Sequence, residues 1–372
     1  MYIRKVEVFS LRLPVKEQFA ISGGTVAAPN QGAPHVYVKV TDEEGNAGWG
    51  EARPSHRWSY ETAETVATTI QMYLAPLLIG RQAGDLQTIR YLMNREIAGS
   101  MHPGQPIAKA AVDTALHDLL CKQRNLTLPE LWAAPFREMI RLSYLISTSD
   151  PEEAARKAEY AVKEGYTGID VKIGLDPSKD MEMIEAVSQK AKNLFIRVDA
   201  NQAYDISTAV KIAKQLERLG ADVFEQPLPA SDWFGHRELR RRTGIPIALD
   251  ESIWSPADVI QAFRMEACDS VVIKLTKMGG LAAAKRCGEI AAEAGLSLLG
   301  GGLTESRLGL SASAHLFTYL QIVPPVDLNG PMFLEDDPVE TGPVVEGGHV
   351  TLQRLPGIGC TVSERKLNNF KF

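Results

Sequence analysis

Alternating hydrophobic and polar positions near the N-terminus predict a small antiparallel sheet. The alternation covers residues 2–12, 35–41 and 46–51, and the turn sequence DEEGNAG between the last two predicts a hairpin. Two segments with apolar residues at three- and four-residue spacing follow, over roughly 60–79 and 105–125. The first part of the chain is therefore expected to be an α+β unit.

The pattern changes from Arg141 onward, where short β-branched runs alternate with amphipathic helical segments such as ISTAVKIAKQLERLG. Eight strands are predicted, in the segments RLSYLIS, GIDVKI, LFIRVDA, ADVFEQP, IPIALDE, SVVIKLT, LSLLGGG and QIVPPVDL. Eight strands alternating with helices are typical of a TIM (β/α)8 barrel, so the predicted fold class is α/β.

Charged residues end four consecutive predicted strands. Asp199, Glu225, Asp250 and Lys274 follow one another at steps of 26, 25 and 24 residues, so each barrel repeat brings one charge to the same height. A single acidic residue at a strand end is usually a helix cap or a solvated loop residue, but three in succession favour a common role. Three converging carboxylates repel one another unless a cation lies between them, and Mg²⁺ prefers carboxylate oxygens. We therefore assign Asp199, Glu225 and Asp250 as ligands of Mg²⁺, with Mn²⁺ as the alternative ion.

Composition and charge narrow the classes of function. The 372 residues are 45% hydrophobic and 23% charged, enough to bury a substantial core. The net charge is −6 at pH 7 and basic residues form no stripe with aromatics, so no nucleic-acid partner is expected. The four cysteines lie far apart, and no apolar run resembles a signal peptide or a membrane span. These features favour a cytoplasmic protein without a membrane partner.

Several motifs carry a resemblance to a known family. VDANQAY, FEQPLP, LDES and IKLTKMGGL resemble the metal and lysine motifs of the enolase superfamily, in particular its muconate lactonizing enzyme subgroup. The resemblance implies a capping α+β domain over 1–130, a modified barrel over 131–328 and a C-terminal segment over 329–372 that returns to the cap. It also implies an essential Mg²⁺, a small-molecule carboxylate substrate and a homo-oligomer. Catalysis in this family starts with removal of the proton α to the carboxylate, which gives an enediolate.

Two lysines are candidates for the group that removes this proton. Lys172 ends the second predicted strand and Lys274 the sixth, and these strands lie across the barrel mouth from each other. The subgroup usually has Lys-x-Lys on the second strand, whereas Asp170 precedes Lys172 here, and residues two apart face the same side. Because a carboxylate favours the ammonium form of lysine, we expect Lys172 to be an acid or an electrostatic clamp and Lys274 the principal base.

Other polar residues near the predicted strand ends are expected to support the substrate. Some belong to the polar tails after the strands, and others match family positions that line the site. DLN resembles the Asp-x-Asp with which dipeptide epimerases bind an α-ammonium group, with the second acid replaced. The candidates are Asn201, Glu251, Glu305, Asp327 and Asn329.

The resemblance also implies that the capping domain mainly determines substrate choice, through residues 15–30 and 52–60. The segment FAISGGTVAAPNQG is rich in glycine and small side chains, which predicts a mobile flap. The segment RPSHRWSYET offers Arg53, His56, Arg57, Trp58 and Tyr60, and an aromatic ring with such basic neighbours could recognise a second anionic or planar group. A solvated loop with one packed tryptophan is the alternative.

The opposed lysines favour racemisation or epimerisation of an amino-acid-like carboxylate. Cycloisomerisation of a muconate-like diacid is the first alternative, followed by dehydration of a hydroxy acid. A sugar-acid dehydratase is less favoured because no His-Asp pair ends the seventh and sixth strands. A phosphate cradle at LGGGLTES lacks a Walker signature and a basic cluster. The non-enzyme alternative is a catalytically silent barrel scaffold, which would not bind Mg²⁺.

Overall fold

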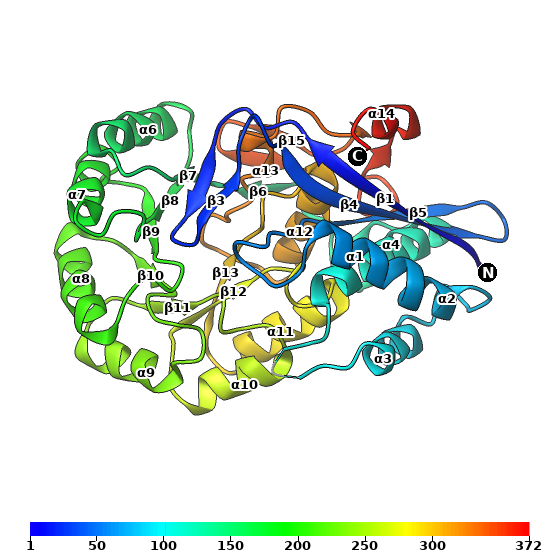
Figure 1. The fold of residues 1–372 in the computed structure, drawn as a ribbon, viewed down its shortest axis with the longest axis horizontal. Coiled ribbons are helices and arrows are strands. Elements are labelled where there is room, and N and C mark those ends of the chain that lie inside the picture. The colour runs from blue at the N-terminus through cyan, green and yellow to red at the C-terminus, as the bar shows by residue number, and fades with distance from the viewer. Residues whose placement is uncertain (101, 372) are drawn as a thin grey trace.

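The structure is a computed structural model that describes residues 1–100 and 102–371. A seven-stranded parallel sheet curls inside an arc of helices, and a three-stranded antiparallel sheet from the N-terminal region lies beside it (Figure 1). Among the described residues, no helix is both long enough and apolar enough to cross a bilayer.

The N-terminal sheet has the strand order β1-β4-β5. Its strands match the alternating segments of the sequence and are β1 (Ile3–Leu13), β4 (Ala33–Asp42) and β5 (Ala47–Ala52). Helix α4 (Pro106–Arg124) packs so closely on this sheet that a Cβ on Gly48 would lie 2.1 Å from a helix carbonyl oxygen, and one on Gly50 2.0 Å. Glycine is needed at both positions because any side chain would push α4 away.

The helix expected over 60–79 begins later and is interrupted. Thr62 caps it by accepting a hydrogen bond from Thr65 N at 3.3 Å. Pro76 has no N–H for the α-helical ladder, and the turn before it widens, with Ala75 N donating to Ile70 O. The remaining N-terminal elements are α1 (Ala63–Thr69), the π-helical turn η1 (Ile70–Leu74), α2 (Ala75–Leu78), α3 (Leu86–Glu96), α5 (Leu128–Leu131), and the hairpin of β2 (Phe19–Ile21) and β3 (Gly24–Ala27).

The strands of the parallel sheet lie side by side in the order in which they occur in the chain. Its strands are buried on both faces, which explains their continuous apolar runs. The strands are β7 (Ser143–Ile146), β8 (Gly168–Lys172), β9 (Phe195–Asp199), β10 (Val223–Glu225), β11 (Ile247–Leu249), β12 (Ser270–Ile273) and β13 (Ser297–Gly300). The helices are α6 (Pro151–Lys163), α7 (Asp180–Lys190), α8 (Ile206–Leu219), α9 (Trp233–Arg242), α10 (Pro256–Arg264), α11 (Leu281–Glu293) and α12 (Arg307–Tyr319).

The prediction of an eighth strand in QIVPPVDL is wrong. Its two prolines have no N–H to donate to a ladder, and the segment pairs only through one isolated bridge on each side. Ser143 N donates to Val326 O at 3.0 Å, and Asp327 N donates to Gly300 O at 3.0 Å. The segment therefore joins β13 to β7 and closes the modified barrel with two residues in place of a strand.

The C-terminal region runs back toward the N-terminal sheet. Arg12 N on β1 donates to Phe370 O at 2.8 Å, and both chain ends lie on the side of this sheet in Figure 1. Strand β6 pairs with β16 outside the barrel. The elements are β6 (Met139–Arg141), α13 (Gly330–Phe333), β14 (Val339–Thr341), β15 (Val344–Glu346), β16 (His349–Thr351), β17 (Thr361–Val362) and α14 (Glu364–Asn368).

Glu51 on β5 joins the N-terminal sheet to the barrel. Its carboxylate accepts hydrogen bonds from Ser306 N at 2.9 Å and Gly309 N at 2.7 Å, at the start of α12, and lies 2.6 Å from His35 Nδ1. Burial opposes its charge, but these donors outweigh burial and lower the pKa of Glu51. This contact fixes the loops after β5 over the barrel mouth.

Candidate active site

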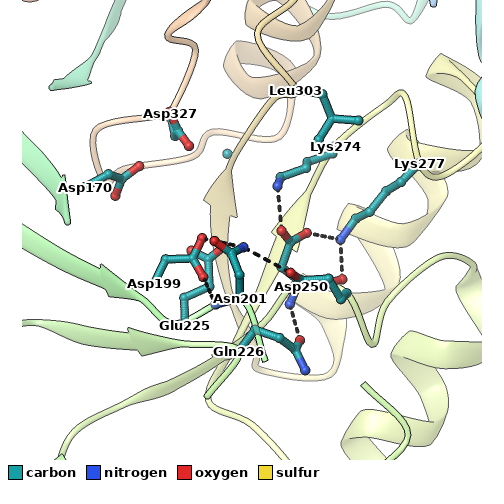
Figure 2. A network of polar contacts seen from close by, with 12 residues as sticks. Asp170, Asp199, Asn201, Glu225, Gln226, Asp250, Lys274, Lys277, Leu303 and Asp327 are labelled. Carbon is teal, nitrogen blue, oxygen red and sulfur yellow. Dashed lines mark hydrogen bonds and ion pairs between the residues drawn. The ribbon is translucent and has the colours of Figure 1, made fainter. Parts of the chain in front are cut away.

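The carboxyl ends of the barrel strands gather the predicted charged residues. Lys172, Asp199 and Glu225 are the last residues of β8, β9 and β10, and Asp250 and Lys274 directly follow β11 and β12. All five side chains are buried. Figure 2 shows that the acidic residues and Lys274 surround one region of the mouth, as the strand-end spacing predicts.

The lysines pair with the predicted metal ligands. Lys172 Nζ lies 2.5 Å from Asp199 Oδ2, and Lys274 Nζ lies 2.5 Å from Asp250 Oδ2. Burial opposes the charge on both ammonium groups, but Asp199 outweighs it at Lys172 and Asp250 outweighs it at Lys274, so both pKa values are raised. Both lysines are therefore charged in this arrangement.

A third lysine, Lys277, was not predicted. It is wholly buried and donates to both Asp250 O and Asp250 Oδ1 at 2.6 Å. Burial opposes the ionisation of Asp250, but Lys274 and Lys277 outweigh it and lower its pKa. The sequence KLTK could have indicated this residue, because it places a second lysine three positions after Lys274 in the same loop.

Two carboxyl groups at the mouth bind their protons more tightly than usual. Burial raises the pKa of Glu251 to about 8, with help from the carboxylates of Asp250 and Asp199. Burial and the Asp199 carboxylate also raise the pKa of Glu225 well above its usual range. Glu251 Oε2 and Asn201 Oδ1 are buried without a hydrogen-bond partner among the described residues. Buried oxygens without donors are what a hard cation requires.

These residues fit a Mg²⁺ ion. In the described part of the chain, no three Asp, Glu, His or Cys side chains are preassembled as cation ligands, since ammonium groups occupy oxygens of Asp199 and Asp250. The available donors are carboxylate and amide oxygens, which suit Mg²⁺ better than a softer metal. Asp199, Glu225 and Asp250 could hold such an ion if Lys172 and Lys274 moved away.

The expected pairing of Asp170 with Lys172 is replaced by a stronger contact. Both Asp170 oxygens accept hydrogen bonds from Arg197, the residue opposite on β9, and Oδ2 also accepts one from Ser143 Oγ at 3.2 Å. Arg197 Nε lies 3.2 Å from Glu225 Oε2 as well. Burial opposes the charge on Arg197, but Asp170 and Glu225 outweigh it and raise its pKa further. Asp199, rather than Asp170, is therefore the main partner of Lys172.

The two lysines open onto one cavity of about 30 Å³ under the N-terminal loops. Lys274 Nζ lies 4.9 Å from the centre of the Trp58 ring, which packs on Trp254 at 5.4 Å between ring centroids. This face of the ring attracts the ammonium group and excludes water from it. The cavity wall combines polar groups with an apolar roof and consists of Phe19, Ile21, Val26, Ser55, Trp58, Lys172, Asn201, Lys274, Gly302, Leu303, Thr304, Asp327 and Asn329.

The remaining predicted residues divide between this cavity and its surroundings. Asn201, Asp327 and Asn329 line it, and Asp327 Oδ2 lies 3.9 Å from Lys172 Nζ. Glu251 lies behind Asn201, from whose Nδ2 it accepts a hydrogen bond at 3.0 Å. Glu305 is buried and accepts hydrogen bonds from Thr276 Oγ1 at 2.9 Å and Leu303 N at 2.8 Å. His56 is exposed and lines a neighbouring cavity.

The glycine run after β13 is explained by close packing. A Cβ on Gly301 would lie 2.7 Å from Lys274 Cε, and one on Gly302 would lie 2.4 Å from Glu305 Oε2. Side chains here would displace the candidate base and its neighbour. This explains the glycines of LGGGLTES without a phosphate cradle.

Left-handed backbone conformations cluster around the same mouth. Asn201 (φ 41°), Gln226 (φ 36°) and Thr304 (φ 64°) are non-glycine residues in the segments that follow β9, β10 and β13. Each costs conformational energy that the surrounding contacts must offset, and such strain is concentrated at functional sites. Gln226 Oε1, for example, accepts a hydrogen bond from Asp250 N at 2.9 Å.

Comparison with known proteins agrees with the geometry. The N-terminal domain model of the mandelate racemase / muconate lactonizing enzyme family matches residues 3–132, and the enolase C-terminal domain-like model matches residues 153–366. N-succinyl-L-Arg/Lys racemase of Bacillus cereus is 31% identical over 99% of this chain and 97% of that protein. Chloromuconate cycloisomerase of Pseudomonas putida is 30% identical over 100% of this chain and 99% of that protein.

A solved structure shows the same fold. The dipeptide epimerase of Cytophaga hutchinsonii, complexed with Mg and the dipeptide D-Ala-L-Val, superposes with a TM-score of 0.93 at 29% identity, covering 100% of this chain and 99% of that one. These matches confirm the predicted superfamily and the modified barrel fold. The chain belongs to the mandelate racemase / muconate lactonizing enzyme family of the enolase superfamily and is an enzyme of the isomerase type found among its relatives.

Proposed function

We propose that the protein removes the proton α to a substrate carboxylate, with Mg²⁺ as its cofactor, and that it racemises or epimerises an amino-acid-like acid. The observation that carries this proposal is the placement of Lys172 and Lys274. They come from β8 and the end of β12, which three strands separate in the sheet, yet both line one cavity. A substrate between them would present opposite faces to the two amines.

The proposed reaction uses the two lysines in turn. One neutral amine takes the α proton, the C–H electron pair moves into the carboxylate as an enediolate, and the opposite ammonium returns a proton to the other face. Asp199, Glu225 and Asp250 would hold Mg²⁺, which supplies Lewis-acid stabilisation of the carboxylate charge. Lys274 must leave Asp250 before it can reach the substrate, because the two are 2.5 Å apart here.

The roof of the cavity favours an apolar substrate side chain. The members of this roof carry no charge: Phe19, Ile21 and Val26 come from the β2–β3 hairpin, and Trp58 comes from the loop after β5. Burying an apolar group against them is favourable, whereas an unpaired charge would be costly. Among the relatives are racemases and epimerases that are named for amino-acid derivatives, which supports an amino-acid-like substrate.

The cycloisomerase alternative rests on the chloromuconate cycloisomerase relative. Both reactions are tested by incubating the protein with Mg²⁺ in D₂O and separate pools of N-acyl amino acids, dipeptides and muconates, with α-deuterium followed by mass spectrometry. Deuterated product of inverted configuration from an apolar amino acid derivative is expected. Ring closure of a muconate without turnover of amino acid derivatives would replace the proposal by the alternative, and no exchange in any pool despite Mg²⁺ binding would exclude both.

A further inference from the structure

A cavity of about 150 Å³ lies where helices of the N-terminal region meet helices of the barrel, and we call it the interhelix cavity. Its walls come from α3 and α4 on one side and from α11 and the start of α10 on the other. Helices α3, α10 and α11 lie in the lower part of Figure 1. Among the described residues, it shares no wall residue with the cavity between Lys172 and Lys274. Pockets for drug-sized ligands measure about 300–1,000 Å³, so this cavity suits a small ion.

Three cationic side chains from three helices line the interhelix cavity. They are Arg90 on α3, Lys109 on α4 and Arg286 on α11, whereas no described Asp or Glu belongs to the wall. The side chains of Arg90 and Arg286 form neither a hydrogen bond nor an ion pair with another described residue. This convergence of positive charge occurs in a chain whose net charge is −6. An anion that entered the cavity would therefore meet unpaired cations on both sides.

The cations of the interhelix cavity are held close together at an electrostatic cost. Lys109 is buried, and its Nζ donates to Ile97 O at 2.8 Å, which leaves further ammonium hydrogens without an acceptor. Burial lowers the pKa of Lys109 to about 8, although Glu61 attracts it. Burial and the Arg286 guanidinium lower the pKa of Arg90, although Asp113 attracts it. An anion between these groups would relieve the repulsion and replace lost hydration.

The two nearby carboxylates do not supply this missing anion. Glu61 accepts hydrogen bonds from Ile107 N at 2.8 Å and Ala108 N at 3.0 Å, at the start of α4. Asp113 Oδ2 accepts one from Ala282 N at 3.1 Å, at the start of α11. Each carboxylate is thus held by backbone donors, and neither belongs to the cavity wall.

We propose that the interhelix cavity binds a small oxyanion of the phosphate class, which ties the N-terminal helices to the barrel. Arg90 and Lys109 contact the ion from the N-terminal side, and Arg286 contacts it from the barrel side. Met93 and Met278 in the wall exclude water and so strengthen the attraction. Free phosphate and the phosphate group of a small ester share this chemistry. The ion takes no part in the removal of the α proton, so this inference does not depend on the proposed function.

Calorimetric titration of the full chain with potassium phosphate tests the site. The titration is done at pH 7 with EDTA, at an ionic strength kept constant with KCl, so that neither a bound divalent metal nor general screening contributes. Wild type is expected to bind phosphate with a Kd of about 1 mM or lower. Arg286→Met, at an exposed position, should raise this Kd at least about tenfold, and Arg286→Lys should recover part of the loss. The matched control is Arg95→Met, which lies on α3 but over the Tyr91 ring outside the cavity, and it should bind as wild type does.

Hydrogen exchange followed by mass spectrometry tests the tie between the two sides. Phosphate should slow amide exchange in peptides from both α3 and α11 of wild type, and it should have no such effect in Arg286→Met. Glycerol 3-phosphate serves as the ester: tighter binding than phosphate, lost in the same variant, would support an ester as the ligand, and equal or weaker binding would support the free ion.

Three results would overturn the inference. They are no binding by wild type at about 10 mM phosphate, a Kd unchanged in both Arg286→Met and Arg90→Met, and protection confined to one side of the cavity. Because no substrate is present, these results leave the proposed function untouched. Failure of α-deuterium exchange would likewise leave the phosphate site standing.

Discussion

Asp170 on β8 and Arg197 on β9 face each other as register partners, and the guanidinium donates to both carboxylate oxygens. Arg197 also lies 3.2 Å from Glu225 and 3.5 Å from Asp327. The carboxylate that stands in place of the usual first lysine is thereby neutralised inside the barrel wall. Lys172 therefore pairs with Asp199 at the mouth of the barrel.

This pair should be strongly coupled. Arg197→Met and Asp170→Leu each leave one buried charge without its partner, and each is expected to lower the free energy of unfolding by about 3–5 kcal/mol. The double variant should lose clearly less than the sum, as measured by urea denaturation at pH 7. Lys5→Met, which breaks an exposed pair with Glu7, should change stability by less than about 1 kcal/mol. Additive losses in the double variant would show that the two side chains are not energetically coupled.

Magnesium should stabilise the folded protein. Binding to the folded state alone raises the free energy of unfolding by about 2.7 kcal/mol when free Mg²⁺ is 100 times its Kd. Glu225→Gln should abolish most of this increase, because it removes one proposed ligand charge. Asp269→Asn, directly before β12 and thus at the opposite end of the strand from Lys274, should keep it. Denaturation with Mg²⁺ and with EDTA measures the effect, and an unchanged increase in Glu225→Gln would contradict the assignment.

Trp58 should support catalysis through its contact with Lys274. Trp58→Leu keeps an apolar roof but removes the ring face 4.9 Å from Nζ, which is expected to lower kcat/KM by about 3- to 30-fold. A matched control is Trp132→Leu, which removes a similar contact with Lys285 at 6.0 Å outside the cavity. Steady-state kinetics on an N-acyl amino acid compare the two, and equal losses would indicate a general effect on stability.

Glu61 should make stability depend on pH. Burial raises its pKa to about 7, although Ile107 N and Ala108 N at the start of α4 donate to it. Its ordinary pKa is 4.5, so between pH 4.5 and 7 the folded protein holds a proton that the unfolded chain has released. The contribution of Glu61 to the free energy of unfolding therefore falls as the pH rises through this window, by about 3 kcal/mol.

Glu61→Gln should remove this dependence. The free energy of unfolding of wild type, relative to that of Glu61→Gln, is expected to decrease from pH 4.5 to pH 7 and then to level off. Glu43→Gln, at an exposed position, should parallel wild type. A constant difference between wild type and Glu61→Gln across this range would contradict the raised pKa.

The periodicity of the sequence located the charged residues at the strand ends. It could not show which side chains contact one another across neighbouring strands. The step from Asp199 to Glu225 equals one barrel repeat, so the sequence located both at one mouth. Arg197 sits inside an apolar run, and its role appears only when β9 lies beside β8. His56 lies on a loop after β5 without a repeating pattern, so its side chain could not be placed beforehand.

The most direct test of the account is α-deuterium exchange from each enantiomer of one N-acyl amino acid, with Mg²⁺ in D₂O. Wild type should exchange and interconvert both enantiomers. Lys274→Ala should lose exchange from one enantiomer and Lys172→Ala from the other, because the lysines face opposite sides of the α-carbon. Lys285→Ala, whose ammonium group also lies over a tryptophan ring, should behave as wild type. Exchange of both enantiomers at the wild-type rate in either active-site variant would contradict the account.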